Sequence, residues 1–406
     1  GTSRFMRRFM TQEMNLEKED MYQIDGPLDM TVFFGFCGIK GYNHLRYPEA
    51  HPHSPWSMLE LKRTPETNIF DMIREKDLLI HLPYESFDES VVNFLYSAAN
   101  DKDVLAIKQT LYRVSSSSPV VQALEKAVQN GKQVTVLMEV KARFDEANNI
   151  LMARRLEKAG AHVIYGLVGL KTHSKCTLVI RREKDGIRRY VHVATGNYNA
   201  STAKLYTDLG ILTCNDRFGI DASAFFNLLS GYSDPPIWDS FIVAPINLRQ
   251  RCIELIDREI HFAKNGEDAH MIAKMNSLLD KGIIEKLYEA SQAGVKIELI
   301  VRGICVLIPG IPGVSDNITV RSIVGRFLEH SRIFWFRNGG REELYISSAD
   351  WMPRNLNDRV ELMVPIEDPE IKRRLKQMVD IELSDNQKAH IMQADGTWLK
   401  TISAEN

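Results

Sequence analysis

The sequence VVQALEKAVQNGKQVTVLMEV (residues 120–140) returns in altered form as IIEKLYEASQAGVKIELIVRG (residues 283–303). In each copy, apolar residues at helical spacing lead to a turn glycine, Gly131 or Gly294, and a β-branched strand follows at once. This alternation of helix and strand signals is typical of an α/β fold in which helices cover both faces of a sheet. The two glycines lie 163 residues apart, so the sequence predicts two copies of one α/β unit.

A second matching pair lies downstream, THSK at residues 172–175 and EHSR at residues 329–332. Their histidines, His173 and His330, lie 157 residues apart, and a hydrophobic strand and a small-residue turn follow each. Two similar offsets in the same order indicate a duplication. Because a pseudo-twofold axis places equivalent loops face to face, we expect the two histidines to share one cleft. Each copy then ends in a polar–apolar segment: LYTDLGILT (residues 205–213) and LNDRVELMV (residues 356–364).

Composition sets the broad class of the protein. A chain of 406 residues with 44% hydrophobic and 26% charged residues is typical of a globular protein of two or three domains. The net charge of −2 provides no global cationic field, which argues against nucleic acid as a partner. The five cysteines are odd in number and form no C-x-x-C pair, so neither a disulfide framework nor a zinc site is expected. We therefore predict a reducing, cytoplasmic location.

Three segments are expected along the chain. Residues 1–59 are interpreted as a remnant of a preceding head domain with a linker, because three prolines fall within residues 51–65. Residues 60–240 form the first α/β domain and residues 241–406 the second, with Pro235-Pro236 marking the seam between them. The chain begins with glycine rather than methionine, which suggests a processed or excised product.

Each histidine is followed two residues later by a cation: His173-x-Lys175, with Gly196-Asn197 after it, and His330-x-Arg332. This pattern resembles the duplicated H-x-K plus G-x-N arrangement of the phospholipase D-like superfamily, which transfers phosphoryl groups through a phosphohistidine. In such a reaction a neutral imidazole attacks phosphorus, cations neutralise the equatorial oxygens, and a second acid protonates the leaving oxygen. The superfamily's aspartate a few residues after the lysine is missing here, since residues 176–180 are CTLVI.

Further motifs extend from about residue 77 to residue 390: TLYR (110–113), NGKQVTV (130–136), KARFDE (141–146), GLKTHSK (169–175), TGNYN (195–199), LYTDL (205–209), VRG (301–303), SDNI (315–318), LEHSR (328–332), NGG (338–340) and SSADWM (347–352). Together they resemble polyphosphate kinase of the first of its two types. The resemblance implies two tandem, duplicated phospholipase D-like α/β domains with a catalytic cleft between them. It also implies an ATP-dependent kinase that reversibly transfers the terminal phosphoryl of ATP to inorganic polyphosphate.

Carried over residue by residue, the resemblance makes His173 the phosphorylated nucleophile and His330 the second histidine of the cleft. Tyr206 in LYTDL, Arg302 in VRG and His330 match the positions that contact ATP in the family. The expected phosphate ligands also include the residues of the two motifs: Lys175, Asn197 and Arg332.

Arg113 in TLYR and Arg143 in KARFDE match positions that the family associates with magnesium. A guanidinium is always cationic and has no lone pair to give a metal. We therefore expect both arginines to bind phosphate oxygens beside a Mg²⁺ ion that hard oxygen ligands hold.

Two alternatives differ in class from the kinase. A phospholipase D-like phosphodiesterase or nuclease is disfavoured by the missing aspartates and by the arginine at position 332. A catalytically silent nucleotide-binding fragment would keep the sites without turnover, because most of the family's N-terminal domains are absent. For the full-length kinase, ATP or ADP and polyphosphate are the expected partners and a homo-oligomer the expected assembly; membrane association cannot be inferred from these residues.

Overall fold

The structure is a computed structural model that describes residues 2–17, 20–63, 67–115, 117–141, 145–167, 169–231 and 237–401. The chain separates into two compact units, residues 1–50 and residues 51–406. Among its described residues, the first unit contains the helical segments α1 (Arg4–Glu13), η2 (Met30–Gly38) and η3 (Asn43–Leu45). None of their residues is buried, so these segments form no hydrophobic core of their own.

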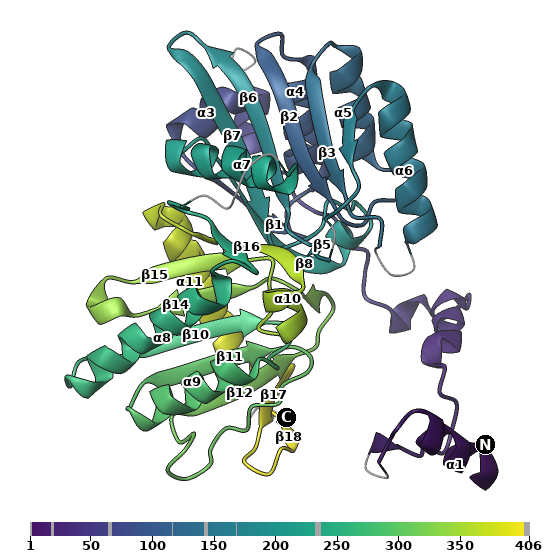
Figure 1. Ribbon diagram of the computed structural model, residues 1–406, viewed down its shortest axis with the longest axis vertical. Coiled ribbons are helices and arrows are strands. Elements are labelled where there is room, and N and C mark those ends of the chain that lie inside the picture. The colour runs from purple at the N-terminus through teal and green to yellow at the C-terminus, as the bar shows by residue number, and fades with distance from the viewer. Residues whose placement is uncertain are drawn as a thin grey trace. The chain divides into compact units, whose positions relative to one another are not determined.

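The second unit contains two β-sheets, drawn in the upper and lower halves of Figure 1. In the described chain the first sheet has the order β1-β8-β7-β6-β2-β3-β4, with β13 paired to β8. Strands β2, β3 and β4 are parallel, whereas β1, β8, β7, β6 and β2 pair antiparallel in turn. The strands are β1 (Leu78–Leu82), β2 (Val104–Leu111), β3 (Gln133–Met138), β4 (His162–Ile164), β6 (Cys176–Glu183), β7 (Gly186–Ala194), β8 (Tyr206–Thr213) and β13 (Leu328–Glu329).

The second sheet repeats this plan. Its order is β18-β17-β12-β11-β10-β14-β15-β16-β5, with β9 paired to β16. Strands β10, β11 and β12 are parallel, as β2, β3 and β4 are in the first sheet. The strands are β5 (Lys171–Thr172), β9 (Ile242–Ala244), β10 (His270–Met275), β11 (Lys296–Val301), β12 (Ile318–Ile323), β14 (Ile333–Phe336), β15 (Glu343–Ser347), β16 (Arg359–Pro365), β17 (Ala389–Met392) and β18 (Trp398–Lys400).

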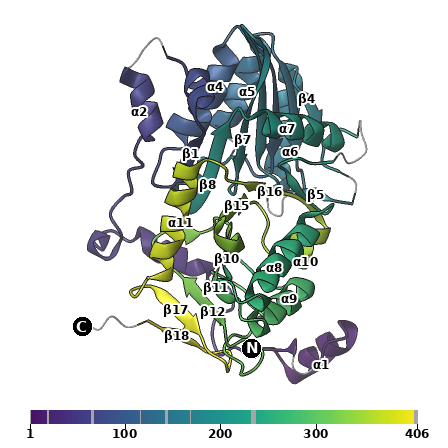
Figure 2. The ribbon, with the colours of Figure 1, turned by 90° about the vertical axis from the view of Figure 1, so that its left-hand side faces the viewer.

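The second unit also contains helices, most of which lie against these sheets, as Figures 1 and 2 show. They are α2 (Trp56–Arg63), α3 (Ile69–Glu75), η4 (Asp88–Val92), α4 (Asn93–Asn100), α5 (Pro119–Gln129), α6 (Glu146–Ala159), η5 (Thr202–Lys204), α7 (Asp216–Leu229), α8 (Leu248–Lys264), α9 (Lys281–Gln292), η6 (Asn338–Gly340), α10 (Pro353–Asn357) and α11 (Pro369–Leu383). No described helix combines the length and apolar content that a bilayer crossing requires.

The repeated helix–glycine–strand unit forms twice, as the sequence predicts. Helix α5 begins where the Ser118 side chain accepts a hydrogen bond from a backbone N–H of its first turn, and it ends before Gly131 with a φ of 77°. Helix α9 begins at Asp280 with the same kind of cap and ends before Gly294 with a φ of 98°. A left-handed φ favours glycine at the end of a helix, and β3 or β11 follows at once.

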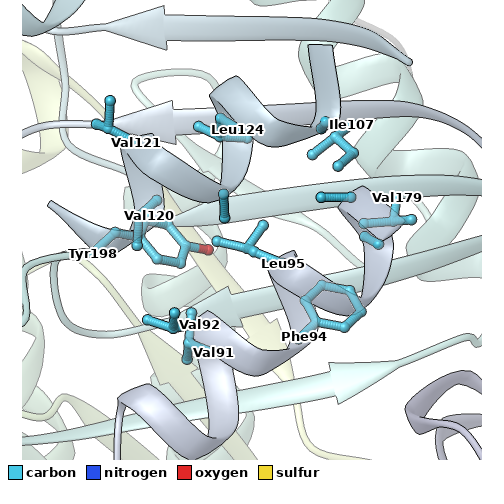
Figure 3. Packing of buried hydrophobic residues seen from close by; sticks show 14 of the residues in the cluster. Val91, Val92, Phe94, Leu95, Ile107, Val120, Val121, Leu124, Val179 and Tyr198 are labelled. Atoms are coloured by element: carbon cyan, nitrogen blue, oxygen red, sulfur yellow. The ribbon is translucent and has the colours of Figure 1, made fainter. Parts of the chain in front are cut away.

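Both faces of the first sheet are covered. Val179 of β6 packs with the α4 and α5 side chains, a cluster that Figure 3 shows around Leu95 and Leu124. Leu178, the residue before Val179 in β6, points to the opposite face and packs in a cluster with α7. That second cluster also contains side chains of the second sheet and of α11, which Figure 2 shows extending from the level of one sheet to that of the other. The α/β fold class is confirmed.

The two halves exchange short strands. Lys171–Thr172 (β5) leaves the first half and pairs in parallel with β16 of the second sheet. Leu328–Glu329 (β13) leaves the second half and pairs in parallel with β8 of the first sheet. Since these strands directly precede His173 and His330, the exchange places each histidine against the opposite half of the duplication.

Candidate active site

His173 is held by the second half of the chain. Its backbone N–H donates to the carbonyl of Val360 at 2.9 Å, and its Nδ1 lies 2.8 and 2.9 Å from the two carboxylate oxygens of Glu361. Glu361 lies on β16 and is completely buried. We name His173, Lys175 and Glu361 the first half-site.

His330 is held by the first half of the chain in the same way. Its backbone N–H donates to the Thr207 hydroxyl at 3.2 Å, and its Nδ1 lies 2.8 and 3.0 Å from the carboxylate oxygens of Asp208. Asp208 lies on β8 and is also buried. We name His330, Arg332 and Asp208 the second half-site; each half-site takes its carboxylate from the opposite half of the chain.

Both imidazoles are held neutral with the Nδ1 hydrogen directed at a carboxylate. Burial lowers the pKa of His173 well below its ordinary value, and the charges of Lys175 and Arg359 lower it further. Burial also lowers the pKa of His330, although Asp208 opposes this shift. When Nδ1 donates to a carboxylate, the proton-free Nε2 presents a lone pair, which is the form that a nucleophile or a base requires.

A hydroxyl fixes each carboxylate. Thr195 donates to Asp208 at 2.6 Å, and its oxygen accepts the Leu209 N–H at 3.0 Å. Ser348 donates to Glu361 at 2.5 Å, and its oxygen accepts the N–H of residue 362 at 3.0 Å. The two carboxylates are therefore positioned by the same hydrogen-bond pattern in both halves.

Lys175 is the buried cation of the first half-site. Its ammonium lies 3.0 Å from Nε2 and 3.1 Å from Nδ1 of His173 and also contacts the carbonyl of that residue. Burial lowers the pKa of Lys175 to about 7, against the opposing charge of Glu361. Within the described residues Lys175 forms no ion pair with a carboxylate, so its charge is available to a bound anion.

Arg332 is the buried cation of the second half-site, and it is already paired. Its Nε and Nη2 donate to the two oxygens of Asp350 at 3.1 and 3.0 Å. Only Nη1 faces the histidine, at 3.2 Å from Nε2 of His330, while it also donates to the carbonyls of His330 and Thr195. Burial alone lowers the pKa of Arg332, but Asp350 raises it above the ordinary value.

The structure brings the predicted nucleotide-binding residues to the second half-site. The rings of Tyr206 and His330 lie 5.2 Å apart between centroids. Arg302 donates through Nε to the Asn276 side chain at 3.0 Å and to the carbonyl of Glu329 at 2.7 Å. This contact fixes the guanidinium one residue before His330.

Asn197 lies in the turn after β7, and its Oδ1 is buried without a hydrogen-bond partner among the described residues. Sterics require glycine at the preceding position, residue 196. A Cβ on Gly196 would lie 2.1 Å from Oδ2 of Asp208, so only glycine leaves room for the carboxylate that holds His330.

Arg113 lies beside the first half-site. The ring of Tyr112 meets the ring of His173 edge-on at 4.8 Å, and the Arg113 guanidinium lies 5.5 Å from the centroid of the Tyr112 ring. Arg113 is also ion-paired with Asp145 at 3.1 Å. Arg143 lies outside the described residues.

The residues present do not fit a metal held by the protein alone. Among the described residues, no three histidine, cysteine, aspartate or glutamate side chains come together as a ligand set. The carboxylates of Asp208 and Glu361 are already engaged with imidazoles, and the two predicted arginines have no lone pair to offer.

Asp208 and Glu361 were missed by sequence reasoning. An acidic residue inside a strand carries no spacing signal of its own, because carboxylates are by default surface residues. The available signal was the duplication: Asp208 and Glu361 lie 153 residues apart, as do Thr195 and Ser348. The shift of 153 residues that relates Thr195 to Ser348 therefore pairs the two carboxylates.

Known families account for most of the chain. Residues 68–235 match Polyphosphate kinase C-terminal domain 1, and residues 241–406 match Polyphosphate kinase C-terminal domain 2. The chain belongs to the polyphosphate kinase family. The chain is 55% identical over 384 residues to the polyphosphate kinase of Halalkalibacterium halodurans, covering 94% of this chain and 54% of the relative. It is 49% identical over 418 residues to that of Thermosynechococcus vestitus, covering 98% of this chain and 57% of the relative.

Solved structures agree with this assignment. The crystal structure of polyphosphate kinase from Porphyromonas gingivalis is similar with a TM-score of 0.86 and 35% identity, covering all of this chain and 61% of that one. Phosphatidylserine synthase from Haemophilus influenzae shares the fold, with a TM-score of 0.50 and 11% identity over 78% of this chain and 87% of that one. The chain thus spans about half the length of the curated polyphosphate kinases that it matches.

Proposed function

We propose that this chain carries the phosphoryl-transfer centre of a polyphosphate kinase, with His173 as the covalent carrier. The observation that supports it is the environment of His173: a buried glutamate on Nδ1, a buried lysine 3.0 Å from Nε2, and a second histidine, held by a carboxylate in the same way, whose charge lowers the pKa of His173. A neutral, oriented imidazole beside a cation is what nucleophilic attack on a phosphoryl group requires.

In the first step the lone pair on Nε2 of His173 attacks the terminal phosphorus of ATP. A bond forms between Nε2 and phosphorus, the bond from phosphorus to the bridging oxygen breaks, and ADP leaves with that electron pair. Glu361 stabilises the positive charge that develops on the ring, and Lys175 faces the transferring oxygens.

In the second step a terminal oxygen of polyphosphate attacks the same phosphorus. The bond from phosphorus to Nε2 breaks, its electrons return to the ring, and the polymer is one phosphate longer. His330 is proposed to assist by proton transfer or charge stabilisation, with Tyr206 and Arg302 contacting the nucleotide and Arg332 and Asn197 contacting phosphate.

Magnesium is proposed to arrive with the nucleotide and polymer phosphates. Mg²⁺ keeps several waters and is commonly bound through one or two carboxylates and substrate phosphates, which agrees with the lack of a three-ligand set among the described residues. Arg113 and Arg143 are then phosphate contacts beside the ion.

The wider expectations are part of the same proposal. The domain boundaries 60–240 and 241–406 are supported by the family matches to residues 68–235 and 241–406; residues 1–59 are proposed as part of a preceding domain. A cytoplasmic location and a homo-oligomer of the full-length protein stay predictions.

The experiment must also distinguish two alternative functions from the kinase. The phosphodiesterase is disfavoured because the family matches are to polyphosphate kinase and because Asp350 neutralises Arg332. The silent nucleotide-binding fragment is distinct because it would bind ATP without forming a covalent intermediate.

Incubation of the chain with ATP labelled at the terminal phosphate, in the presence of magnesium, tests the proposal. We expect acid-labile label on the protein, its removal when unlabelled polyphosphate is added, and no label on His173→Ala. His330→Ala should still accept label but should pass it to polyphosphate about 10²- to 10⁴-fold more slowly, the usual contribution of an acid–base group.

Other outcomes identify the alternatives. Equal labelling of His173→Ala would show that another residue is the carrier. Nucleotide binding by calorimetry without label would identify a silent fragment, and release of monophosphate from a labelled diester would identify a phosphodiesterase.

A further inference from the structure

The two half-sites correspond residue by residue. A shift of 153 residues relates Thr195 to Ser348 and Asp208 to Glu361. The hydrogen bonds repeat as well, since each hydroxyl donates to its carboxylate and accepts the following backbone N–H. The same shift relates Asn197 to Asp350, so one position in this frame is neutral in the first copy and acidic in the second.

This difference changes the charge of the second half-site. Asp350 is buried and pairs with Arg332 through both carboxylate oxygens, and it also accepts the Asn276 N–H at 2.7 Å. Burial opposes ionisation, but Arg332 lowers the pKa of Asp350 to about 2. The carboxylate is thus ionised, and it cancels the charge of the arginine.

The first half-site has no equivalent of this pair. The counterpart of Asp350 is Asn197, whose Oδ1 is buried without a partner among the described residues. Lys175, the counterpart of Arg332, is 1% exposed and contacts the ring of His173 rather than a carboxylate. Its ammonium is therefore available to the transferring oxygens. In Arg332, Nε and Nη2 donate to Asp350, and Nη1 donates to the carbonyls of Thr195 and His330.

The two half-sites differ in the charges that surround the cation. In the first, the single carboxylate of Glu361 faces Lys175 and lies 4.0 Å from the guanidinium of Arg359. In the second, Arg332 faces two carboxylates, Asp208 and Asp350, and the net charge is negative. A transferring phosphoryl group is itself negative, so the second half-site stabilises it less than the first does.

We propose that Asp350 and Asn197 determine which of the two histidines carries the phosphoryl group. Asp350 neutralises Arg332 and holds its Nε and Nη2, so that only Nη1 of Arg332 faces His330. His330 is then an assisting residue rather than the carrier. Asn197 leaves the charge of Lys175 to the phosphoryl group on His173. This inference rests on the proposed function, because it presupposes a phosphohistidine.

An exchange of the two residues tests the inference in the full chain. Asn197→Asp should slow acid-labile labelling of His173 by about 10²- to 10³-fold, the usual effect of losing a charged group aimed at a transferring oxygen. Asn197→Ala removes the amide without adding charge and should cost clearly less. Asn265→Asp makes the same chemical change at an exposed position at the end of α8, where the amide contacts His261, and should change the rate less than tenfold.

The reciprocal change asks whether His330 can become the carrier. His173→Ala with Asp350→Asn should acquire acid-labile label on His330, whereas His173→Ala alone should have none. Thermal unfolding of each variant shows whether the protein still folds when Arg332 has lost its ion pair with Asp350. If the double variant does not fold, Asn197→Asp and Asn197→Ala test by themselves whether this position determines the carrier.

The results separate the two proposals. Labelling of Asn197→Asp at the wild-type rate, or at the rate of Asn197→Ala, overturns the inference, as does a folded double variant without label. Absence of label on the wild-type chain overturns the proposed function instead.

Discussion

The first and second half-sites share their geometry and differ in how they use charge. In both, a buried carboxylate from the opposite half holds Nδ1 of a neutral histidine, at 2.8 Å from the nearer oxygen. In the first, the neighbouring cation is a lysine that forms no ion pair within the described part of the chain. In the second, it is an arginine held by both carboxylate oxygens of Asp350. Both copies thus keep the carboxylate that orients the imidazole, while the surroundings of the cation differ between them.

The carboxylates of the two half-sites differ in length. Asp208 reaches His330 across Gly196, which leaves no room for a Cβ. Glu361 reaches His173, and the residue that the shift of 153 aligns with Gly196 is Ala349. The glycine of the G-x-N pattern is therefore required by the short carboxylate rather than by a left-handed backbone.

The largest effect is expected from removing the charge of each carboxylate. Glu361→Gln should slow labelling of His173 by about 10³- to 10⁴-fold, since an amide can hold the wrong tautomer and does not stabilise a charged ring, as measured for an aspartate-to-asparagine change in a serine protease triad. Asp208→Asn should leave labelling nearly intact and slow the transfer to polyphosphate. Rapid-quench labelling followed by a polyphosphate chase measures both steps.

If Glu361→Gln and Asp208→Asn slow the same step equally, the division of roles between the half-sites is wrong. Circular dichroism and thermal unfolding provide the control, because both carboxylates are buried.

The next effect concerns Arg113, which lies beside the first half-site. A cation positioned on a transferring phosphoryl group contributes on the order of 2 to 4 kcal/mol, so Arg113→Ala should reduce turnover by about two to three decades. Arg113→Lys should restore little, because an ammonium cannot reproduce a bidentate fork. Steady-state turnover at saturating ATP checks this, and the same reduction is predicted for Arg143→Ala.

Near-normal turnover of Arg113→Ala would show that its ion pair with Asp145 at 3.1 Å is its only role. Asp145→Asn separates the two cases, since it breaks that ion pair while leaving the guanidinium in place.

Local signals in the sequence were sufficient for the repeated unit but not for the exchange between halves. Helix α5 and strand β3 carry their own caps, periodicity and glycine, so they could be predicted from residues 120–140 alone. Strands β5 and β13 are two residues long, and each forms only because a partner strand of the other half is present. No local pattern encodes such a pairing.

The site residues also divide into those that a local motif predicts and those whose contacts depend on the folded structure. A short repeated motif made four residues recognisable: His173, Lys175, His330 and Arg332. In the structure they form two equivalent histidine–cation pairs. Asp350 was visible in the sequence SSADWM, but its bidentate contact with Arg332 depends on how deeply both side chains are buried. Burial of that kind follows from packing and not from spacing.

A smaller effect is expected at Gly196. The Cβ of Gly196→Ala would overlap the Asp208 carboxylate, at 2.1 Å from Oδ2, so the carboxylate must shift from His330. Forced overpacking of this kind typically costs about 1 to 3 kcal/mol, and we expect a lower melting temperature with a roughly tenfold to hundredfold slower transfer step. Ala349→Gly is the matched change at the position that the shift of 153 aligns with Gly196, and it should alter transfer by less than tenfold. Equal effects of the two changes would contradict the steric argument.

The smallest effect is a pH dependence confined to the first half-site. Burial lowers the pKa of Lys175 to about 7, so in the free protein its positive charge is present below that pH and lost above it. The value of kcat/KM, which reports the free enzyme, should therefore fall as the pH rises above about 7, by at most tenfold per pH unit. Over the same range the contribution of Lys175 to the free energy of unfolding should increase with pH. The reason is that the unfolded chain, with a lysine pKa of about 10.4, binds more protons than the folded one. The opposite signs distinguish loss of charge from loss of structure. Lys175→Arg should remove the decline between pH 7 and pH 9, since a guanidinium stays charged, and a kcat/KM of the wild type that is flat or rises over this range would exclude Lys175 as the titrating cation.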